Sequence, residues 1–485
     1  MTFVSSKNKI MGNIVNSVKW SSIDRLAVQA IQFILSMVIA RQLLPSDYGV
    51  VAMLSIFINI AQVFIDSGFS QALIQKQNRT QKDYSTVFYF NIVVGFALYG
   101  VFVLCAPLIA DFYNAPLLKI IIAVVGINFV VNSFSTVQRA LISINLEFKK
   151  QAKISLISVF VSGSVALWMA YHNYGPWTLV LQFLINNICN TILLWVTSKW
   201  HPIMTFSMQS FNEMFAFGSK LLASNILHKI YCNLYNVIIG KVFAPSDLGY
   251  FNRAYTLSTT PSNIFTSTIA RAVYPIECKM QDKPDELASK FLSILSITSV
   301  LVFPILLGIS AVAQPMIKIL LTDKWLPCVP YIQIMCFAYM FDPIMGISAD
   351  LLSVKRRGDY VLITEILKKI CAFSILFATI FFGIKVMCIG LILYAFCDMA
   401  IVFVYIHKLL PQITAKILFK TFFPILMSAL IMWVGVFLFC ESNLHAWFRL
   451  IVGILLGGVI YIAVGILIMP QNIRMFFSLL KNGFK

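Results

Sequence analysis

Two polar stripes inside apolar segments of this chain could bind an anion. The first has spacings of four, three and four residues, which place its members on one helix face: Arg25, Gln29, Gln32 and Ser36. The second lies 200 residues later in the same register: Asn225, Lys229, Cys232 and Asn236. Guanidinium and ammonium groups bind anions, and the planar fork of arginine matches phosphate. The stripes therefore predict the walls of a cationic cavity, with phosphate as the natural ligand.

Further cations lie in or beside the apolar segments. A charge at the centre of a bilayer costs about 2.5–3.5 kcal/mol, so each one is a functional hypothesis. The candidate substrate-binding residues are Arg25, Gln29, Gln32, Lys220, Lys229, Asn236, Arg253 and Arg271. Two alternatives stay open. The polar stripes could form hydrogen bonds between helices of a solid bundle, and Arg253 and Arg271 could extend toward the membrane surfaces.

Carboxylates inside the apolar segments are candidates for ion coupling. They are Asp342, which precedes a proline in mid-segment and could carry a coupling proton, together with Asp24 and Asp66. Glu365 precedes Lys368 by three residues, a spacing that predicts a local ion pair.

Patterns for catalysis, metal binding or a cofactor are missing from the sequence. The ten cysteines are scattered singly without CxxC spacing, which is typical of buried small apolar side chains. We find no nucleophile motif, no metal-ligand spacing and no glycine-rich loop that would cradle a phosphate. The sequence therefore predicts a binding or transport protein rather than an enzyme, with no metal and no cofactor.

The composition predicts an all-α integral membrane protein. The chain has 485 residues, of which 59% are hydrophobic and 12% charged, far from the balance of soluble domains. Its net charge of +18 does not indicate nucleic acid, because the basic residues lie in short segments between apolar runs. We expect about fourteen transmembrane helices, near 18–41, 48–70, 85–110, 117–141, 154–172, 176–197, 215–242, 250–275, 290–320, 329–353, 360–383, 387–409, 419–440 and 447–469.

The distribution of lysine and arginine predicts that both termini are cytoplasmic. With that orientation most basic residues of the connecting segments lie inside. The longest connection, around Thr197 to Glu213, is too short to fold alone. Whatever the protein does, we expect it to happen within the bilayer.

An internal repeat divides the chain. Pro-Ser-Asp-x-Gly occurs at 45–49 and again at 245–249, each time after an apolar run and a basic residue. We predict a six-helix lobe over 1–206, a second over 207–412, and two additional helices with a tail over 413–485. Six is even, so the lobes should be related by an axis along the membrane normal. The turns themselves need no substrate contact, because proline and aspartate suit a helix start.

Several stretches together resemble the Wzx-type polysaccharide exporters of the multidrug/oligosaccharidyl-lipid/polysaccharide (MOP) superfamily, in particular the colanic-acid exporter branch. They are the segments DSGFSQALIQ (66–75), STVFYFN (85–91), VQRAL (137–141), YGPW (174–177), YFNRAY (250–255) and Tyr274-Pro275. The resemblance covers essentially the full length. It implies a flippase that moves undecaprenyl-pyrophosphate-linked oligosaccharide units from the cytoplasmic to the periplasmic leaflet of a bacterial inner membrane, by alternating access. The lipid-linked oligosaccharide, membrane lipids and the polysaccharide polymerase and chain-length machinery are the candidate partners.

Other functions remain as alternatives. A drug/cation antiporter of the same superfamily would favour an acidic or aromatic cavity, which the excess of basic residues opposes. A flippase for the peptidoglycan lipid precursor carries another pyrophosphate lipid and is poorly separated by sequence. A membrane-embedded polymerase or ligase should carry a large extramembrane loop with catalytic residues, and this chain has none. A scaffold without transport would not require matched polar faces in repeated helices.

Overall fold

The computed structural model of this protein describes residues 28–66, 72–74, 76, 78–355 and 357–470. These residues form α-helices with two short 3₁₀ turns and no strand. The chain packs as two units, Met1–Gly249 and Tyr250–Lys485, and each is described by itself. The helix Met208–Val242, predicted for the second lobe, packs in the first unit. The lobe boundaries at 206/207 and 412/413 stay a prediction.

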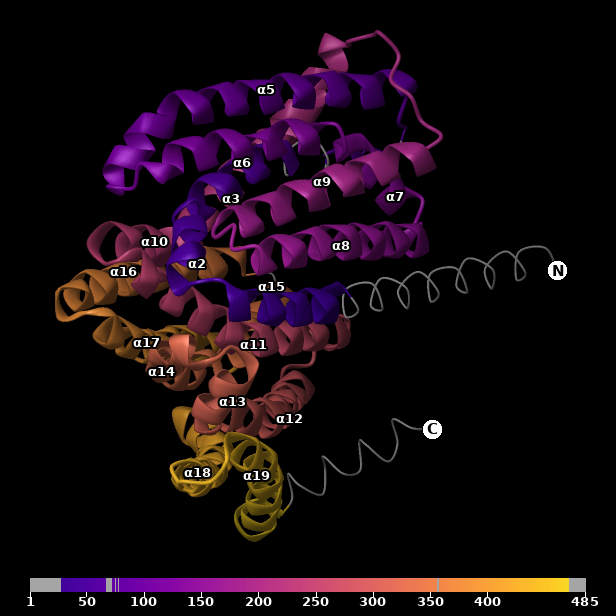
Figure 1. Cartoon of the computed structure of the whole chain (residues 1–485). Helices are drawn as coiled ribbons and strands as arrows, with labels where there is room; N and C mark the ends of the chain where they lie inside the picture. Colours follow the sequence, from indigo (N-terminus) through magenta and orange to yellow (C-terminus); the bar gives the residue numbers. More distant parts are fainter. Residues whose placement is uncertain (1–27, 67–71, 75, 77, 356, 471–485) are drawn as a thin grey trace. The chain divides into compact units, whose positions relative to one another are not determined.

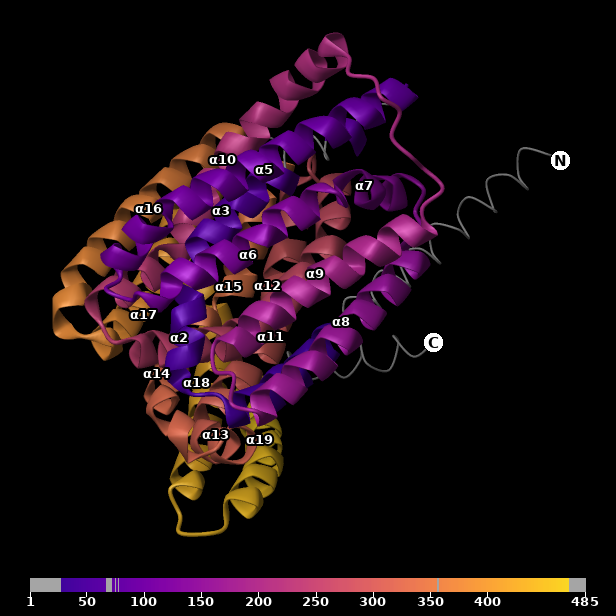
Figure 2. The same ribbon diagram turned by 45° about the horizontal axis from the view of Figure 1, so that its top comes forward.

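The first unit contains the helix Val28–Gln42 and the helices that follow it. They are α2 (Pro45–Met53), α3 (Ser55–Asp66), α5 (Gln81–Phe112), α6 (Leu117–Ser133), α7 (Thr136–Ile144), α8 (Phe148–Tyr171), α9 (Trp177–Thr197) and α10 (Met208–Val242). Helices α5 and α6 run side by side, and so do α8 and α9 (Figures 1 and 2). Helix α10 packs against α3 and α5.

The second unit begins within α11 (Pro245–Lys279). Its other elements are α12 (Pro284–Ala311), α13 (Ala313–Leu320), η1 (Asp323–Cys328), α14 (Val329–Tyr339), α15 (Asp342–Val354), α16 (Gly358–Thr379), η2 (Ile380–Phe382), α17 (Ile384–Leu409), α18 (Ala415–Cys440) and α19 (Ala446–Ile468). Helices α18 and α19 form a pair, coloured yellow in Figure 1, that packs against α12. Helix α16 packs against α17.

The helices begin where the sequence supplies caps. Thr80 and Asp83 cap α5 reciprocally: the Thr80 hydroxyl accepts from the Asp83 amide at 3.3 Å, and the Asp83 carboxylate accepts from the Thr80 amide at 2.7 Å. Pro45 occupies the first position of α2, where its missing N–H costs no hydrogen bond. The predicted segment 329–353 is divided in the structure into α14 and α15, and the proline after Asp342 lies in the first turn of α15.

Eight described helices are long and apolar enough to cross a membrane, or ten if two bent pairs each count as one span. The bent pairs are α2 with α3 and α6 with α7, each with a bend of 44°. The all-α membrane fold is therefore confirmed. Each of the fourteen predicted segments overlaps a helix or a broken helix, but several of these helices are too polar or too short to qualify, and the count of fourteen stays a prediction.

Candidate functional site

The two Pro-Ser-Asp-x-Gly turns touch each other within the first unit. A methyl group added at Gly49 would lie 1.7 Å from the carbonyl oxygen of Pro245. A methyl group added at Gly249 would lie 1.9 Å from the carbonyl oxygen of Pro45. Such distances are far below van der Waals contact, so only glycine allows this approach. The contact is reciprocal, because each repeat places its glycine against the proline of the other.

A side-chain hydrogen bond holds the chain at the first turn, and another holds it just before the second turn. The Asp47 carboxylate accepts a hydrogen bond from the Leu44 amide at 2.9 Å, which caps the start of α2. Lys241, the basic residue before the second turn, donates to the carbonyl of Phe112 at 2.6 Å, at the end of α5. A cation there complements the negative end of the helix dipole.

A polar network crosses the first unit between α3 and α10. The Asn59 side chain donates to the Asn233 side-chain oxygen at 3.1 Å, and the Asn236 side chain donates to the Ser55 hydroxyl at 3.1 Å. Asn233 also donates to the Lys229 carbonyl at 2.8 Å and is only 6% exposed. In an apolar medium such bonds hold helices together, because the polar groups cannot form hydrogen bonds with water instead. Asn236 therefore makes a hydrogen bond between helices, and its role in substrate binding stays a prediction.

The network continues from α3 to α6 and α7. The Asn132 side chain donates to the Gln62 side-chain oxygen at 3.0 Å, and Arg139 donates to the Asn132 side-chain oxygen at 3.2 Å. Gln62 of α3 is therefore bonded to a neighbouring helix of the bundle. Arg139 belongs to one of the segments that carry the family resemblance, although the sequence assigned it no role.

The other predicted binding residues are spread over both units. Gln29 and Gln32 are exposed on the helix Val28–Gln42, and Lys229 is half-buried on α10. Arg253 is 5% exposed, and its guanidinium lies 5.8 Å from the ring centre of Trp325 in η1. Arg25, Asp24 and the side chains of Asp66, Lys220 and Arg271 lie outside what the structure describes. The role of these residues in substrate binding stays a prediction.

A cluster of charges lies between α16 and α17 in the second unit. The Lys368 ammonium is 3.0 Å from Glu365 and 3.2 Å from Asp398, and its side chain is only 9% exposed. The ion pair between Glu365 and Lys368 is confirmed. Asp342 starts α15, which packs against both α16 and α17, and its role in ion coupling stays a prediction. Such a cluster contains groups that can exchange a proton, and its carboxylates can bind a cation in place of the lysine.

A buried carboxylate that sequence reasoning missed lies at the end of α11. Glu277 is fully buried, and neither of its oxygens has a hydrogen-bond partner among the described residues. Burial and Asp350 on α15, a second carboxylate that acts on it, raise the pKa of Glu277. The signal available in the sequence was only an acidic residue just beyond an apolar segment, which is usually solvated.

The fold defines a class: a multi-pass α-helical membrane protein. The chain superposes on the lipid II flippase MurJ (inward closed conformation) with a TM-score of 0.76 at 12% identity, covering 92% of this chain and 98% of that one. It superposes on an inward-facing multidrug resistance MATE family transporter of the MOP superfamily with a TM-score of 0.60 at 12% identity, covering 80% and 98%. At this identity the likeness concerns the fold alone.

Sequence comparisons then give the family. Residues 38–330 match the family described as polysaccharide biosynthesis protein, and the chain belongs to it. The teichuronic acid biosynthesis protein TuaB of Bacillus subtilis is 24% identical over 72% of this chain and 73% of its own length. The lipopolysaccharide biosynthesis protein WzxC of Escherichia coli is 25% identical over 71% and 70%. The succinoglycan biosynthesis transport protein ExoT of Rhizobium meliloti is 22% identical over 64% and 63%. The resemblance to the Wzx-type family is confirmed.

Proposed function

We propose that this protein is a flippase for lipid-linked oligosaccharides. It would move undecaprenyl-pyrophosphate-linked repeat units from the cytoplasmic to the periplasmic leaflet of a bacterial inner membrane. The observation that carries the proposal is the family match over residues 38–330, whose relatives are named for the synthesis or transport of surface polysaccharides. The fold supports the proposal, because the two solved structures that share it are named as a flippase and a transporter.

The proposed mechanism is alternating access between the two repeated halves. The cations predicted for the cavity, above all Arg25 and Lys229, would bind the pyrophosphate. The paired turns at Gly49 and Gly249, which touch each other, would form the gate on the periplasmic face. The buried charges around Lys368 and Asp342 would couple transport to an ion gradient. Polymerase and chain-length proteins would receive the exported unit.

Polysaccharide export is favoured over the two rival cargoes. The relatives found by sequence are named for teichuronic acid, lipopolysaccharide and succinoglycan, whereas the flippase of lipid II and the drug transporter are similar in fold alone. A cationic cavity also suits a pyrophosphate better than a cationic drug.

Deletion in the native host tests the proposal. Lipid-linked repeat units should accumulate and surface polysaccharide should disappear, while mass spectrometry of the accumulated lipid would name the glycan. Arg25→Ala and Lys229→Ala should reproduce the loss with normal amounts of protein in the membrane. Arg25→Lys should restore only part of the export, because lysine lacks the bidentate fork. If the deletion strain accumulates no lipid-linked intermediate, the flippase proposal is wrong. If the deletion strain accumulates the intermediate but both alanine variants export normally, the flippase proposal stands and the cationic cavity is wrong.

A further inference from the structure

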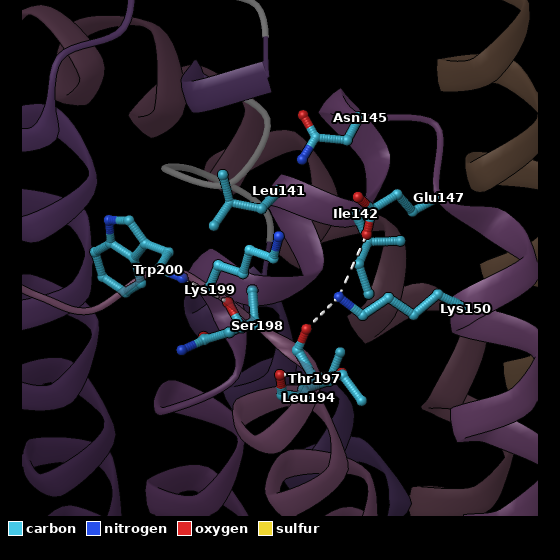
Figure 3. Close-up of a pocket in the computed structure, with 11 residues that line it drawn as sticks. Leu141, Ile142, Asn145, Glu147, Lys150, Leu194, Thr197, Ser198, Lys199 and Trp200 are labelled. Carbon is cyan, nitrogen blue, oxygen red and sulfur yellow. Dashed lines mark hydrogen bonds and ion pairs between the residues drawn. The ribbon is translucent and has the colours of Figure 1, made fainter.

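A small polar pocket lies where α7, α8 and α9 end or begin together, at one end of the first unit. Its volume is about 250 Å³. Figure 3 shows its walls: Asn145 on the turn after α7, Lys150 on the first turn of α8, and Lys199 and Trp200 after the end of α9. Helices α8 and α9 are candidate spans, so the pocket lies at the level where a bilayer meets water. The polar stripes predicted to bind substrate contribute no residue to it.

Gln138 lines this pocket and lacks the partners that its burial requires. Its side chain is 1% exposed, and neither the oxygen nor the nitrogen of its amide has a hydrogen-bond partner among the described residues. Buried amides are nearly always satisfied, because an unmade hydrogen bond leaves the full desolvation cost. An unpartnered amide in a polar pocket therefore indicates that a ligand completes it.

Two lysines give the pocket positive charge. Lys150 bonds to the Thr197 carbonyl and lies 3.3 Å from Glu147, so its charge is partly used. Lys199 makes no hydrogen bond or ion pair with any residue that the structure describes. In Figure 3 the Lys199 ammonium points toward the space between Leu141 and Ile142, whereas the Lys150 ammonium faces Glu147 and Thr197. The pocket thus offers a free cation beside an unused amide.

We propose that this pocket binds a single phosphate group, with a phospholipid head group as its carrier. An ammonium and an amide N–H are donors that a phosphate oxygen accepts. Basic pockets between membrane helices at the head-group level are where anionic lipids bind. A second groove, between α6 and α9, is lined by apolar side chains apart from Thr191, and its lining includes Val196, the residue before the pocket's Thr197. That groove supplies a surface for the acyl chain.

The volume and the aromatic residue argue against a sugar ligand. A pocket of about 250 Å³ holds a head group but not an oligosaccharide repeat unit. The Trp200 ring packs against Phe88 at 5.7 Å and Tyr84 at 6.2 Å, and its N–H donates to Gln81 at 2.9 Å. The ring is therefore used in the fold rather than offered as a platform for stacking.

Thermal unfolding of the purified full-length protein tests the site without any transport readout. The midpoint is measured against added phosphatidylglycerol, phosphatidylcholine and inorganic phosphate, since a ligand of the folded state raises the midpoint with its concentration. Phosphatidylglycerol should stabilise the protein and phosphatidylcholine should not. Lys199→Gln should weaken the apparent affinity for phosphatidylglycerol by roughly tenfold or more, the effect of losing a charged hydrogen bond.

Two further variants separate binding from folding. Lys153→Gln removes an exposed lysine one turn along α8 that does not line the pocket, and should change the affinity less than about twofold. Gln138→Leu should weaken binding but leave the protein without ligand no less stable, because it replaces an unpartnered buried amide with an apolar group. If inorganic phosphate gives the same variant-sensitive effect and the lipid gives none, the phosphate site stands and the lipid carrier is wrong. The site is wrong if Lys199→Gln binds phosphatidylglycerol as tightly as the unmodified protein. It is also wrong if neither phosphatidylglycerol nor inorganic phosphate stabilises the unmodified protein.

Discussion

Alanine at Gly49 or Gly249 should open the contact between the repeated turns. The new methyl group would lie 1.7 Å from Pro245 O in one case and 1.9 Å from Pro45 O in the other, so the turns must separate by more than about 1 Å before it fits. Both clashes involve backbone atoms, which cannot rotate away. Neither glycine has a positive φ, so alanine is otherwise a better helix former at these positions.

The size of the effect follows from this geometry. Forcing extra atoms into a packed contact costs about 1–3 kcal/mol, which changes the ratio of closed to open states by roughly 5- to 150-fold. One separation of the turns relieves both clashes. The double variant should therefore shift the ratio little more than the stronger single variant, a clear departure from additivity.

Distance measurements between labels at positions 46 and 246 supply the assay, in a background without the ten native cysteines. Wild-type protein should show a short and a long distance, and a pyrophosphate lipid should shift their populations. Gly49→Ala and Gly249→Ala should deplete the short one. Gly100→Ala is the matched control, because a methyl group there meets nothing within 4 Å. Unchanged populations and unchanged export in both turn variants would refute the gate.

Three further predictions follow from the described contacts. Lys368→Ala should destabilise the protein by about 3–5 kcal/mol in thermal unfolding, because it leaves the buried carboxylate of Asp398 without its partner. The double variant Lys368→Met with Asp398→Leu should recover most of this loss. Equal stability of the single and double variants would contradict a buried ion pair. Asn233→Ala and Asn59→Ala should each cost about 0.6–1.7 kcal/mol and the double variant little more, since they share one bond; full additivity would show that the bond contributes nothing. An impermeant thiol reagent should label cysteines at 46 and 246 from the periplasm and at 78 only after lysis, and opposite sidedness of 46 and 246 would disprove the parallel repeat.

Local features of the fold were predictable because they depend on neighbouring residues. The Pro-Ser-Asp turns start helices, and Glu365 pairs with Lys368, as their sequence and spacing indicate. Contacts between residues that are far apart in the sequence could not be predicted. Asp398 joins the pair at Lys368 from the next helix, and no periodicity points to it.

The repeat shows the same limit. Its proline and aspartate could be interpreted as caps from one copy alone, but the role of its glycine depends on the other copy, 200 residues away. Likewise, the polar stripe that includes Lys229 and Asn236 was visible in the sequence, whereas its hydrogen-bond partners depend on which helix packs against it. The bond from Asn236 to Ser55 on α3 is one such contact.

The central claim is that the protein moves a lipid-linked oligosaccharide between leaflets, and the position of that lipid tests it most directly. In a strain whose polymerase is also absent, so that single repeat units remain on their lipid, a membrane-impermeant glycan-oxidising enzyme is added to spheroplasts. With the protein present, the lipid-linked sugar should be modified from outside. Without it, the same lipid should accumulate and be modified only after lysis. Equal modification in intact spheroplasts of both strains would contradict the account.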